Sequence, residues 1–342
     1  MTDRRNFIKK SVIASAGITA GIPAAMAKIS QQKEDPIRIG IIGLDTSHSP
    51  AFTKYINDPK NAKTRGAKVV AAYPYGSTRI ESSASRIPEY TEEVKNLGVE
   101  IVDSIRNLIE QVDAVLLETN DGALHLEQAM PVIESKKPLF IDKPVAANLV
   151  DVIRIYENAN KHQAPLFSSS SLRYMPKAQE VRNKQTIGEI TGADTYSPEH
   201  WEPSHTDLYW YGIHGVEILY TIMNTGCQRI RRVLTDHTDL VIGEWTGGRL
   251  GTFRGDLQGH QAYGGTAFGT KGVVELGSFE GYGPLVDQII EFFRSGKSPV
   301  DPAETLELYT FMEAADVCKH RKGDWVELGE IYDNTFKVVQ NE

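Results

Sequence analysis

The sequence has little that would support a disulfide scaffold, a nucleic-acid surface or a membrane-spanning protein. Its 342 residues include only 2 cysteines, Cys227 and Cys318, and neither has C-x-x-C or zinc-type spacing. They could pair in an oxidising compartment, but we expect two buried free thiols. The formal net charge of -8 argues against the basic stripe of a nucleic-acid-binding domain. After residue 27, no apolar run approaches the ~20 residues that span a bilayer.

The first 27 residues look like a twin-arginine export signal. Arg4-Arg5 precedes a weakly apolar run at 11–24, and Ala25-Met26-Ala27 has the form of an A-x-A cleavage site. A chance Arg-Arg before a membrane anchor is the alternative, but the apolar run is short for a span. We therefore expect a periplasmic or exported protein, with residues 28–36 as a polar linker.

The pattern at 37–168 predicts a doubly wound, Rossmann-like parallel sheet. Short β-rich runs alternate with amphipathic stretches, which is typical of βαβ units. The expected strands are 37–42, 67–72, 114–117, 138–141 and 164–168, and the expected helices include 52–57, 124–135 and 149–162. Pro131 falls inside the second of these helices.

The pattern changes after about residue 169 and predicts an α+β domain over 169–342 with an open antiparallel sheet. One helix is expected at 208–223, followed by strands at 229–234, 240–245, 250–253 and 272–276. Glycines concentrate between 243 and 283, as tight turns between antiparallel strands require. Helices at 285–295 and 302–321 are expected to close the fold. The overall class is α/β.

The dinucleotide-binding fingerprint is incomplete after the first strand. Gly40 and Gly43 are present, but a G-x-G-x-x-G pattern starting at Gly43 would need glycine where this chain has Asp45 and His48. The second expected strand leads into Tyr73-Pro74 and lacks the acidic residue that holds the ribose hydroxyls. Residues 45–48 could bind a sugar hydroxyl, a water or a metal, or could simply cap a helix.

Five motifs in order resemble the glucose-fructose oxidoreductase, inositol dehydrogenase and rhizopine-catabolism (Gfo/Idh/MocA) family. They are Ile39-Gly-Ile-Ile-Gly43, Val112-Asp-Ala-Val115 leading to His125, Asp142-Lys-Pro144, His214-Gly-Val-Glu217 and Phe268-Gly-Thr-Lys-Gly272. The resemblance covers essentially the whole chain after the export signal. It implies a sugar-directed oxidoreductase with a tightly bound NAD or NADP.

The resemblance assigns acid/base roles to Lys143 and His214. Asp142-Lys143-Pro144 replaces the family's E-K-P motif, and Lys143 is expected to face both substrate and nicotinamide. His214 matches the family's histidine, but Trp210 stands where an aspartate usually lies four residues earlier. The partner of His214 must therefore come from elsewhere, and the candidates near it in sequence are Glu217, Tyr211, Asp207 and Glu202.

The remaining candidate residues fall into a cofactor group and a substrate group. The cofactor group is Gly40, Gly43, Asp45, Thr46, Ser47, His48, Thr119, Asn120 and His125. The substrate group is Arg173, Tyr174, His200, Trp201, Trp210 and Tyr211. Ser77, Thr78 and Arg79 could bind a 2'-phosphate, which would favour NADP, or could form an ordinary turn.

Histidines and carboxylates are concentrated at 199–207, and this segment could bind a divalent metal. Its spacing matches no metal motif, so we favour a carbohydrate-lining loop and expect no metal there. The function hypotheses are a sugar oxidoreductase, a lyase, hydratase or isomerase acting on an oxidised sugar, and a periplasmic sugar-binding protein. The expected partners are a small carbohydrate and, from the family resemblance, other copies of the chain through the open sheet.

Overall fold

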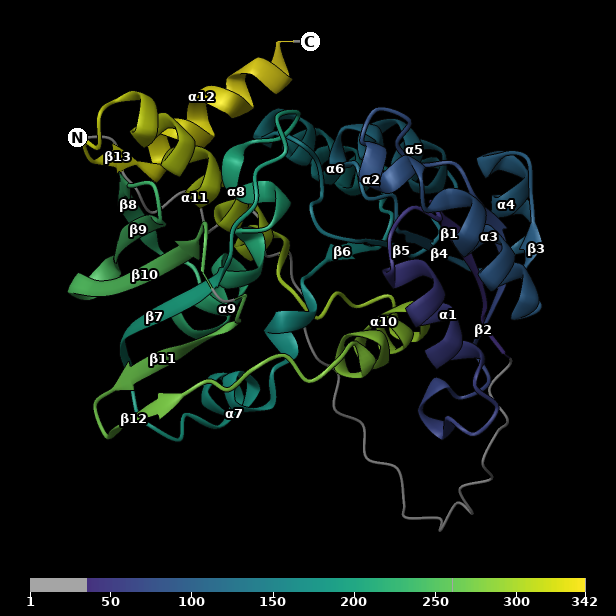
Figure 1. The fold of residues 1–342 in the computed structure, drawn as a ribbon, viewed down its shortest axis with the longest axis horizontal. Coiled ribbons are helices and arrows are strands. Elements are labelled where there is room, and N and C mark those ends of the chain that lie inside the picture. Colours follow the sequence, from purple (N-terminus) through teal and green to yellow (C-terminus); the bar gives the residue numbers. More distant parts are fainter. Residues whose placement is uncertain (1–35, 260, 342) are drawn as a thin grey trace, which may run out of the picture. The chain divides into compact units, whose positions relative to one another are not determined.

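Two sheets carry the fold, one wholly parallel and one mostly antiparallel (Figure 1). The computed structural model describes residues 36–259 and 261–341. The expected export signal at 1–27 therefore lies outside the described residues, as does nearly all of the linker. Within the described ranges, no helix is long and apolar enough to cross a membrane.

The parallel sheet has six strands in the order β3-β2-β1-β4-β5-β6. The strands are β1 (Arg38–Ile42), β2 (Lys68–Tyr73), β3 (Glu100–Ile101), β4 (Ala114–Leu117), β5 (Leu139–Ile141) and β6 (Leu166–Ser168). The order reverses between β1 and β4, so a crevice is expected at their carboxyl ends. This confirms the Rossmann-like prediction. Only the two-residue β3 was missed.

The helices around this sheet follow local sequence signals. They are α1 (His48–Asn57), α2 (Glu81–Ala84), α3 (Ile87–Asn96), α4 (Ile105–Gln111), α5 (His125–Glu134) and α6 (Leu149–His162). The next helix, α7 (Pro176–Lys184), packs instead on α9 (Ile213–Met223). In α6, the Asn148 side chain accepts a hydrogen bond from the Asp151 amide, which caps the helix. Pro131 lies inside α5, as predicted.

The second sheet has seven strands in the order β12-β11-β7-β10-β9-β8-β13. They are β7 (Ile190–Pro198), β8 (Cys227–Leu234), β9 (Thr238–Trp245), β10 (Arg249–Asp256), β11 (Gly264–Gly269), β12 (Gly272–Glu275) and β13 (Val326–Glu327). Its pairs are antiparallel except β7 with β10, which run parallel. The sheet is therefore mixed, and strands β7, β11 and β13 were not predicted.

The predicted continuous helix at 208–223 is wrong, because the chain breaks at Tyr211-Gly212. The segment forms α8 (Asp207–Trp210) and α9 (Ile213–Met223), and Tyr211 between them has φ -130. The later helices are α10 (Gly283–Ser295), α11 (Pro302–His320) and α12 (Leu328–Gln340). The last of these was not predicted.

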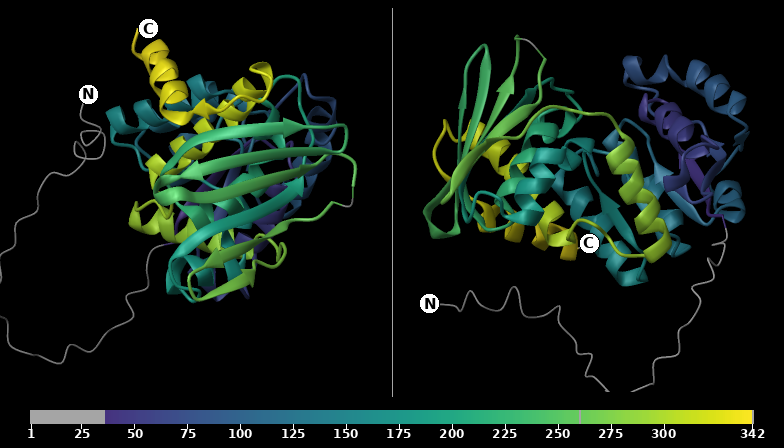
Figure 2. Two further views of the ribbon diagram at one scale, coloured as in Figure 1. Left: turned by 90° about the vertical axis from the view of Figure 1, so that its left-hand side faces the viewer. Right: turned by 90° about the horizontal axis from the view of Figure 1, so that it is seen from below.

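Helices cover one face of the second sheet and leave the other open (Figure 2). Helix α9 packs on β7, β10 and β11, and α11 packs on β8. Side chains on the sheet that remain exposed include Tyr196, Leu250 and Val273. Cys227 and Cys318 are buried and free, as expected.

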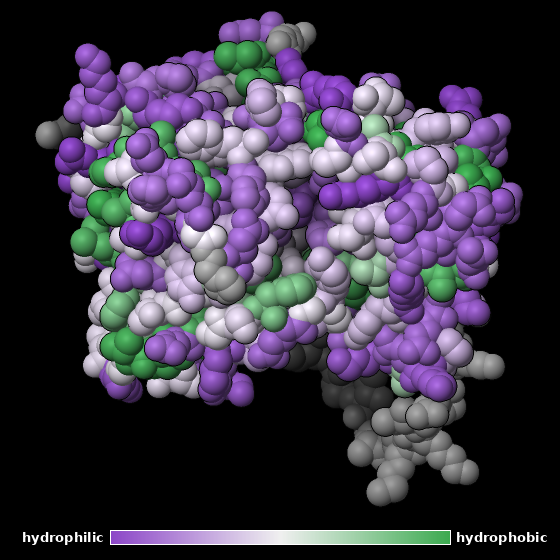
Figure 3. All heavy atoms as spheres, viewed as in Figure 1, coloured by the Kyte–Doolittle hydropathy of each residue, from purple (hydrophilic) through white to green (hydrophobic). Residues whose placement is uncertain are grey.

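The hydrophobic core links the two sheets and so holds the crevice between them in place. One buried cluster runs from Val115 of β4 and Ile141 of β5 to Val216 of α9 and Phe311 of α11. Helix α10, although late in the chain, packs against α1 beside the parallel sheet. Figure 3 shows a mostly hydrophilic face that is hollowed near its middle.

Candidate active site

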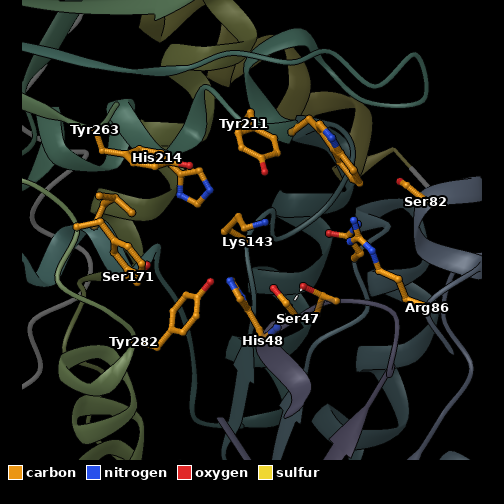
Figure 4. A pocket seen from close by; sticks show the side chains of 15 residues that line it. Ser47, His48, Ser82, Arg86, Lys143, Ser171, Tyr211, His214, Tyr263 and Tyr282 are labelled. Atoms are coloured by element: carbon orange, nitrogen blue, oxygen red, sulfur yellow. Dashed lines mark hydrogen bonds between the residues drawn. The ribbon is translucent and has the colours of Figure 1, made fainter. Parts of the chain in front are cut away.

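A polar cavity of about 220 Å³ lies at the carboxyl edge of the parallel sheet (Figure 4). Its walls come from both halves of the chain. The lining residues are Thr46, Ser47, His48, Ser82, Arg86, Asn120, Lys143, Ser171, Leu172, Trp210, Tyr211, His214, Tyr263, Phe279 and Tyr282. This is the region in which open α/β sheets bind their ligands.

Lys143 reaches the cavity from the end of β5 and lies between His214 and His48 (Figure 4). Only 9% of the residue is exposed. The preceding residue is anchored to the sheet, because the Asp142 amide donates to the carbonyl of Leu117 at 2.9 Å. An ammonium in this position can donate a hydrogen bond or a proton to a substrate oxygen.

His214 faces Lys143 from helix α9, and its partner is a residue that sequence reasoning did not consider. Its Nδ1 lies 2.7 Å from Oγ of Ser170. The proposed partners Glu217 and Asp207 instead pair with arginine and lysine side chains. Burial, followed by the nearby Lys143 ammonium, lowers the pKa of His214 well below 6.5. His214 is therefore neutral near pH 7, as a general base requires.

His48 occupies the opposite wall of the cavity. Its Nδ1 lies 2.7 Å from Oδ2 of Asp142, the residue before the lysine. The ring stacks on Phe52 at 5.3 Å between centroids and meets the edge of Tyr282 at 4.6 Å. These contacts fix the imidazole beside Lys143. Burial would raise the pKa of Asp142, but His48 and Lys143 outweigh it and keep that pKa below its ordinary value.

Asp45, which replaces the second glycine of the fingerprint, does not line the cavity. Its carboxylate is buried and accepts hydrogen bonds from the Ser77 and Asn120 amides, both at 2.9 Å. A Cβ on Gly76 would lie 2.1 Å from the Asp45 carboxylate, so only glycine fits there. Asp45 therefore braces the loops after β2 and β4, and its charge is satisfied internally.

The cavity end away from His214 carries groups that suit an anion. Thr46, Ser47 and His48 form the start of the ten-residue helix α1, whose N-terminus favours negative charge. Ser47 holds the N-cap position without a side-chain cap bond. Arg86 and Ser82 stand at the same end, to the right of Ser47 in Figure 4.

Several residues that were predicted to bind the cofactor do not line the cavity but pack behind its lining residues. A Cβ on Gly40 would lie 2.9 Å from Leu108, and Gly43 turns with φ +88 against Thr119. The imidazole of His125 lies between two carbonyls, those of Thr119 at 2.5 Å and Val145 at 3.2 Å. Of the predicted cofactor group, only Thr46, Ser47, His48 and Asn120 reach the cavity.

Arg173 and Tyr174 do not line the cavity, in contrast to the prediction. Arg173 is 2% exposed and pairs with Glu217 and, at 2.7 Å, with Glu304. Two buried carboxylates require this guanidinium, so its position is set by charge compensation.

The 199–207 segment does not gather its histidines and carboxylates at one point. His200 and Trp201 line a second, open cavity together with Glu199. His205 turns away from them, and its Nε2 accepts a hydrogen bond from the Gly122 amide at 3.1 Å. Burial lowers the pKa of His205 to about 4. The substrate group is therefore divided, since only Trp210 and Tyr211 reach the first cavity.

Sequence reasoning missed Arg86, Ser171, Tyr263, Phe279 and Tyr282 as lining residues. They come from short helices and irregular segments of both halves, where no periodic pattern marks them. Two other residues did carry a signal. Glu118 and Asp142 directly follow the buried strands β4 and β5, at the edge of a parallel sheet where ligands bind, although neither lines the cavity.

Comparison with known proteins agrees with this architecture. Residues 37–170 match the model of an oxidoreductase family with an NAD-binding Rossmann fold, Gfo/Idh/MocA. Inositol 2-dehydrogenase 3 of Saccharopolyspora erythraea is 29% identical over 124 residues, which is 35% of this chain and 32% of that protein. The match thus spans about a third of the curated relative.

Solved structures resemble nearly all of the described fold. A probable dehydrogenase from Thermotoga maritima superimposes with TM-score 0.68 and 23% identity, covering 86% of this chain and 100% of that one. Scyllo-inositol dehydrogenase from Lactobacillus casei, solved with bound NAD(H) and scyllo-inositol, gives TM-score 0.68 and 15% identity over 86% and 99%. At these identities the likeness establishes the fold.

Proposed function

We propose that this chain, whose residues 37–170 match the model of the Gfo/Idh/MocA family of NAD-binding oxidoreductases, oxidises or reduces a cyclic polyol or sugar derivative with NAD(P). The observation that carries the proposal is Lys143, held between His214 and His48 in the crevice at the strand-order reversal. The inositol dehydrogenases among the similar proteins support the substrate class.

The residues present fit a dinucleotide at two places. Its phosphates would be held at the start of α1 by Thr46 and Ser47, with the Arg86 guanidinium close by. Its nicotinamide would lie toward Lys143 and Asn120, and when bound it supplies the group that exchanges a hydride with the substrate. The substitution at Asp45 does not oppose this fit, because that carboxylate is turned away and hydrogen-bonded.

The structure gives no support to a 2'-phosphate site at Ser77-Thr78-Arg79. Arg79 is paired with Asp121 through two hydrogen bonds of 2.7 and 2.8 Å. The Ser77 hydroxyl donates to the same carboxylate at 2.9 Å. These groups hold the loop after β2 to the loop after β4, so the reason for preferring NADP over NAD is removed.

The chain's own residues can move the protons that accompany a hydride transfer. Neutral His214 would accept the proton of the reacting hydroxyl, while Ser170 orients its ring through Nδ1. The Lys143 ammonium would hydrogen-bond the same oxygen as its charge changes. Tyr211 and Trp210 would pack against the ring of a polyol, as amphipathic walls do in small-molecule sites.

Replacing Arg86 by alanine is expected to weaken NAD(H) binding about tenfold or more, because a charged hydrogen bond to phosphate contributes roughly 1.5–3 kcal/mol. Titration calorimetry with NAD(H) measures the loss. Arg106→Ala, on the exposed surface of α4 and away from the cavity, is the matched control. Equal affinity in the two variants would show that the phosphates lie elsewhere.

The acid limb of kcat/KM is expected well below pH 6.5. The folded protein keeps His214 neutral at pH values at which an exposed histidine would be protonated, so the base survives moderate acid. Lys143, His48 and Asp142 are the charged or titratable groups that influence it. The unfolded chain binds this proton near pH 6.5, so stability falls as the pH drops below that value. A limb at or above pH 6.5 that disappears in His214→Asn would show that the pKa of His214 is not lowered in the folded protein.

A second candidate is a non-redox lyase, hydratase or isomerase acting on an oxidised sugar. The observation that favours it is the loop after β2, which carries no acid for the ribose hydroxyls and is tied across to Asp121. Turnover of a keto-sugar by protein extensively dialysed free of nicotinamide would favour this activity over the redox one.

We also propose that the protein is exported and that it self-associates. The first rests on Arg4-Arg5 and the Ala25-Met26-Ala27 site, which lie outside the described residues. The second rests on the uncovered face of the seven-stranded sheet with its exposed Leu250 and Val273 (Figure 2). Signal-dependent appearance in the periplasm and light scattering of the processed chain test the two.

A further inference from the structure

Three side chains that can bind metal converge where His48 lines the cavity. Glu118 follows strand β4, Asp142 follows β5, and His48 is the first residue of α1. One ligand atom from each lies within 4.8 Å of the other two. Two carboxylates and one imidazole thus come together from three separate elements of the parallel domain.

Three carboxylate oxygens in this group have no hydrogen-bond donor. Both oxygens of Glu118 and Oδ1 of Asp142 lack a partner among residues 36–259 and 261–341. Glu118 is 0% exposed and Asp142 is 2% exposed, so bulk water does not solvate them. Buried polar atoms are normally satisfied, and three such oxygens in one place indicate a missing partner.

The nearest protein cation does not fill this role. The Lys143 ammonium is close enough to influence both carboxylates electrostatically, but it donates no hydrogen bond to the three oxygens. By contrast, Asp45 and Asp121, the neighbouring buried acids, have their donors. The lack of hydrogen-bond donors is therefore local to Glu118 and Asp142. Burial and the Asp142 charge raise the pKa of Glu118 well above its ordinary value.

We propose that Glu118, Asp142 and His48 bind a divalent transition-metal cation of the Zn²⁺ or Mn²⁺ type beneath the cavity that Lys143 and His214 line.

The ligand set selects the kind of ion. An imidazole with two carboxylates suits Zn²⁺ or Mn²⁺, whereas Ca²⁺ requires six or more oxygen ligands. With bonds of roughly 2.0–2.2 Å, two ligand atoms on one ion stand about 3–4 Å apart. The ligand atoms that lie within 4.8 Å of one another would move slightly closer, and the 2.7 Å hydrogen bond between His48 and Asp142 would open. Phe52 and Tyr282 already hold the His48 ring, which limits the reorganisation that binding requires.

This inference goes beyond the proposed function and does not rest on it. His48 lines the cavity while Glu118 and Asp142 do not, so the ion would contact the floor of the cavity from below. Metal binding is measured without substrate or nicotinamide. A failure to bind NAD(P) would therefore leave the metal result unchanged, and the reverse also holds.

Calorimetry of the chelator-stripped chain with ZnCl₂ and with MnCl₂ tests the site. We expect one ion per chain for the wild type, and binding at least about 100-fold weaker for Glu118→Gln, which keeps the shape but removes a ligand charge. Glu313→Gln is the matched control, since Glu313 is partly buried but accepts hydrogen bonds from Thr206 and Tyr209. Asp142→Asn provides a second ligand variant should Glu118→Gln fold poorly.

The thermal midpoint of the same proteins supplies a second readout. Zn²⁺ or Mn²⁺ is expected to raise it for the wild type and Glu313→Gln, and to leave folded Glu118→Gln or Asp142→Asn unshifted. Mg²⁺ serves as the comparison ion and is expected to bind more weakly. The proposal is overturned if the folded wild type shows no saturable binding of Zn²⁺ or Mn²⁺. It is equally overturned if a folded ligand variant binds as tightly as the wild type.

Discussion

Replacing Lys143 by methionine is expected to lower kcat about 100- to 10,000-fold in a protein that remains folded, because general acid/base groups contribute rate factors of that size. Methionine keeps the length of the side chain and removes the ammonium that faces the cavity between His214 and His48. Steady-state rates with a polyol substrate and NAD(P) measure the effect.

Lys161→Met is the matched control for this experiment. Lys161 lies exposed in the last turn of α6 and does not line the cavity. We expect its rates to equal those of the wild type. Full activity in Lys143→Met at unchanged thermal midpoint would remove Lys143 from the chemistry, and with it the main support for the proposed active site.

Replacing Arg173 by methionine is expected to destabilise the protein by about 3–5 kcal/mol, the usual cost of leaving a buried charge without its partner. The change leaves Glu217 without a guanidinium and Glu304 with only Arg182. Chemical denaturation of the two proteins measures the difference. If the role of Arg173 is only structural, KM should change little in the fraction of Arg173→Met that stays folded.

The double variant Arg173→Met with Glu217→Gln tests the cause of that loss. Removing the carboxylate together with the guanidinium should restore part of the stability, since the uncompensated charge is gone. A raised KM with unchanged stability in Arg173→Met would instead return the arginine to the substrate cleft, where the sequence had placed it.

The parallel domain was predictable because its signals are local. Strand β4 was predicted residue for residue, since Ala114–Leu117 is apolar throughout and buried on both faces. The position of Lys143 followed in the same way, because Asp142-Lys143-Pro144 comes directly after a strand whose carboxyl end opens on the crevice.

The features that were not predicted depend on the orientation of side chains and on contacts between residues far apart in the sequence. The sequence places a charge at Asp45 but does not tell that the carboxylate turns toward the Ser77 and Asn120 amides. Tyr263 and Tyr282 reach the cavity from irregular segments, which carry no periodicity. The break at Tyr211-Gly212 was hidden by continuous apolar patterning on either side.

The fold shows what the two residues that replace the fingerprint glycines do. Asp45 is an internal brace, and His48, at the position of the last expected glycine, enters the cavity beside Lys143. The substitutions thus remodel the crevice, while the polar start of α1 and the facing side chains of Lys143 and His214 still line the cavity.

The most direct test of the proposed function is spectroscopic. Purified protein is mixed with NAD or NADP and a panel of inositols and sugars, and the absorbance of reduced nicotinamide is followed for the wild type and Lys143→Met. We expect reduction by the wild type with at least one cyclic polyol and little or none by the variant. Turnover of a sugar without bound or reduced nicotinamide would contradict the oxidoreductase assignment.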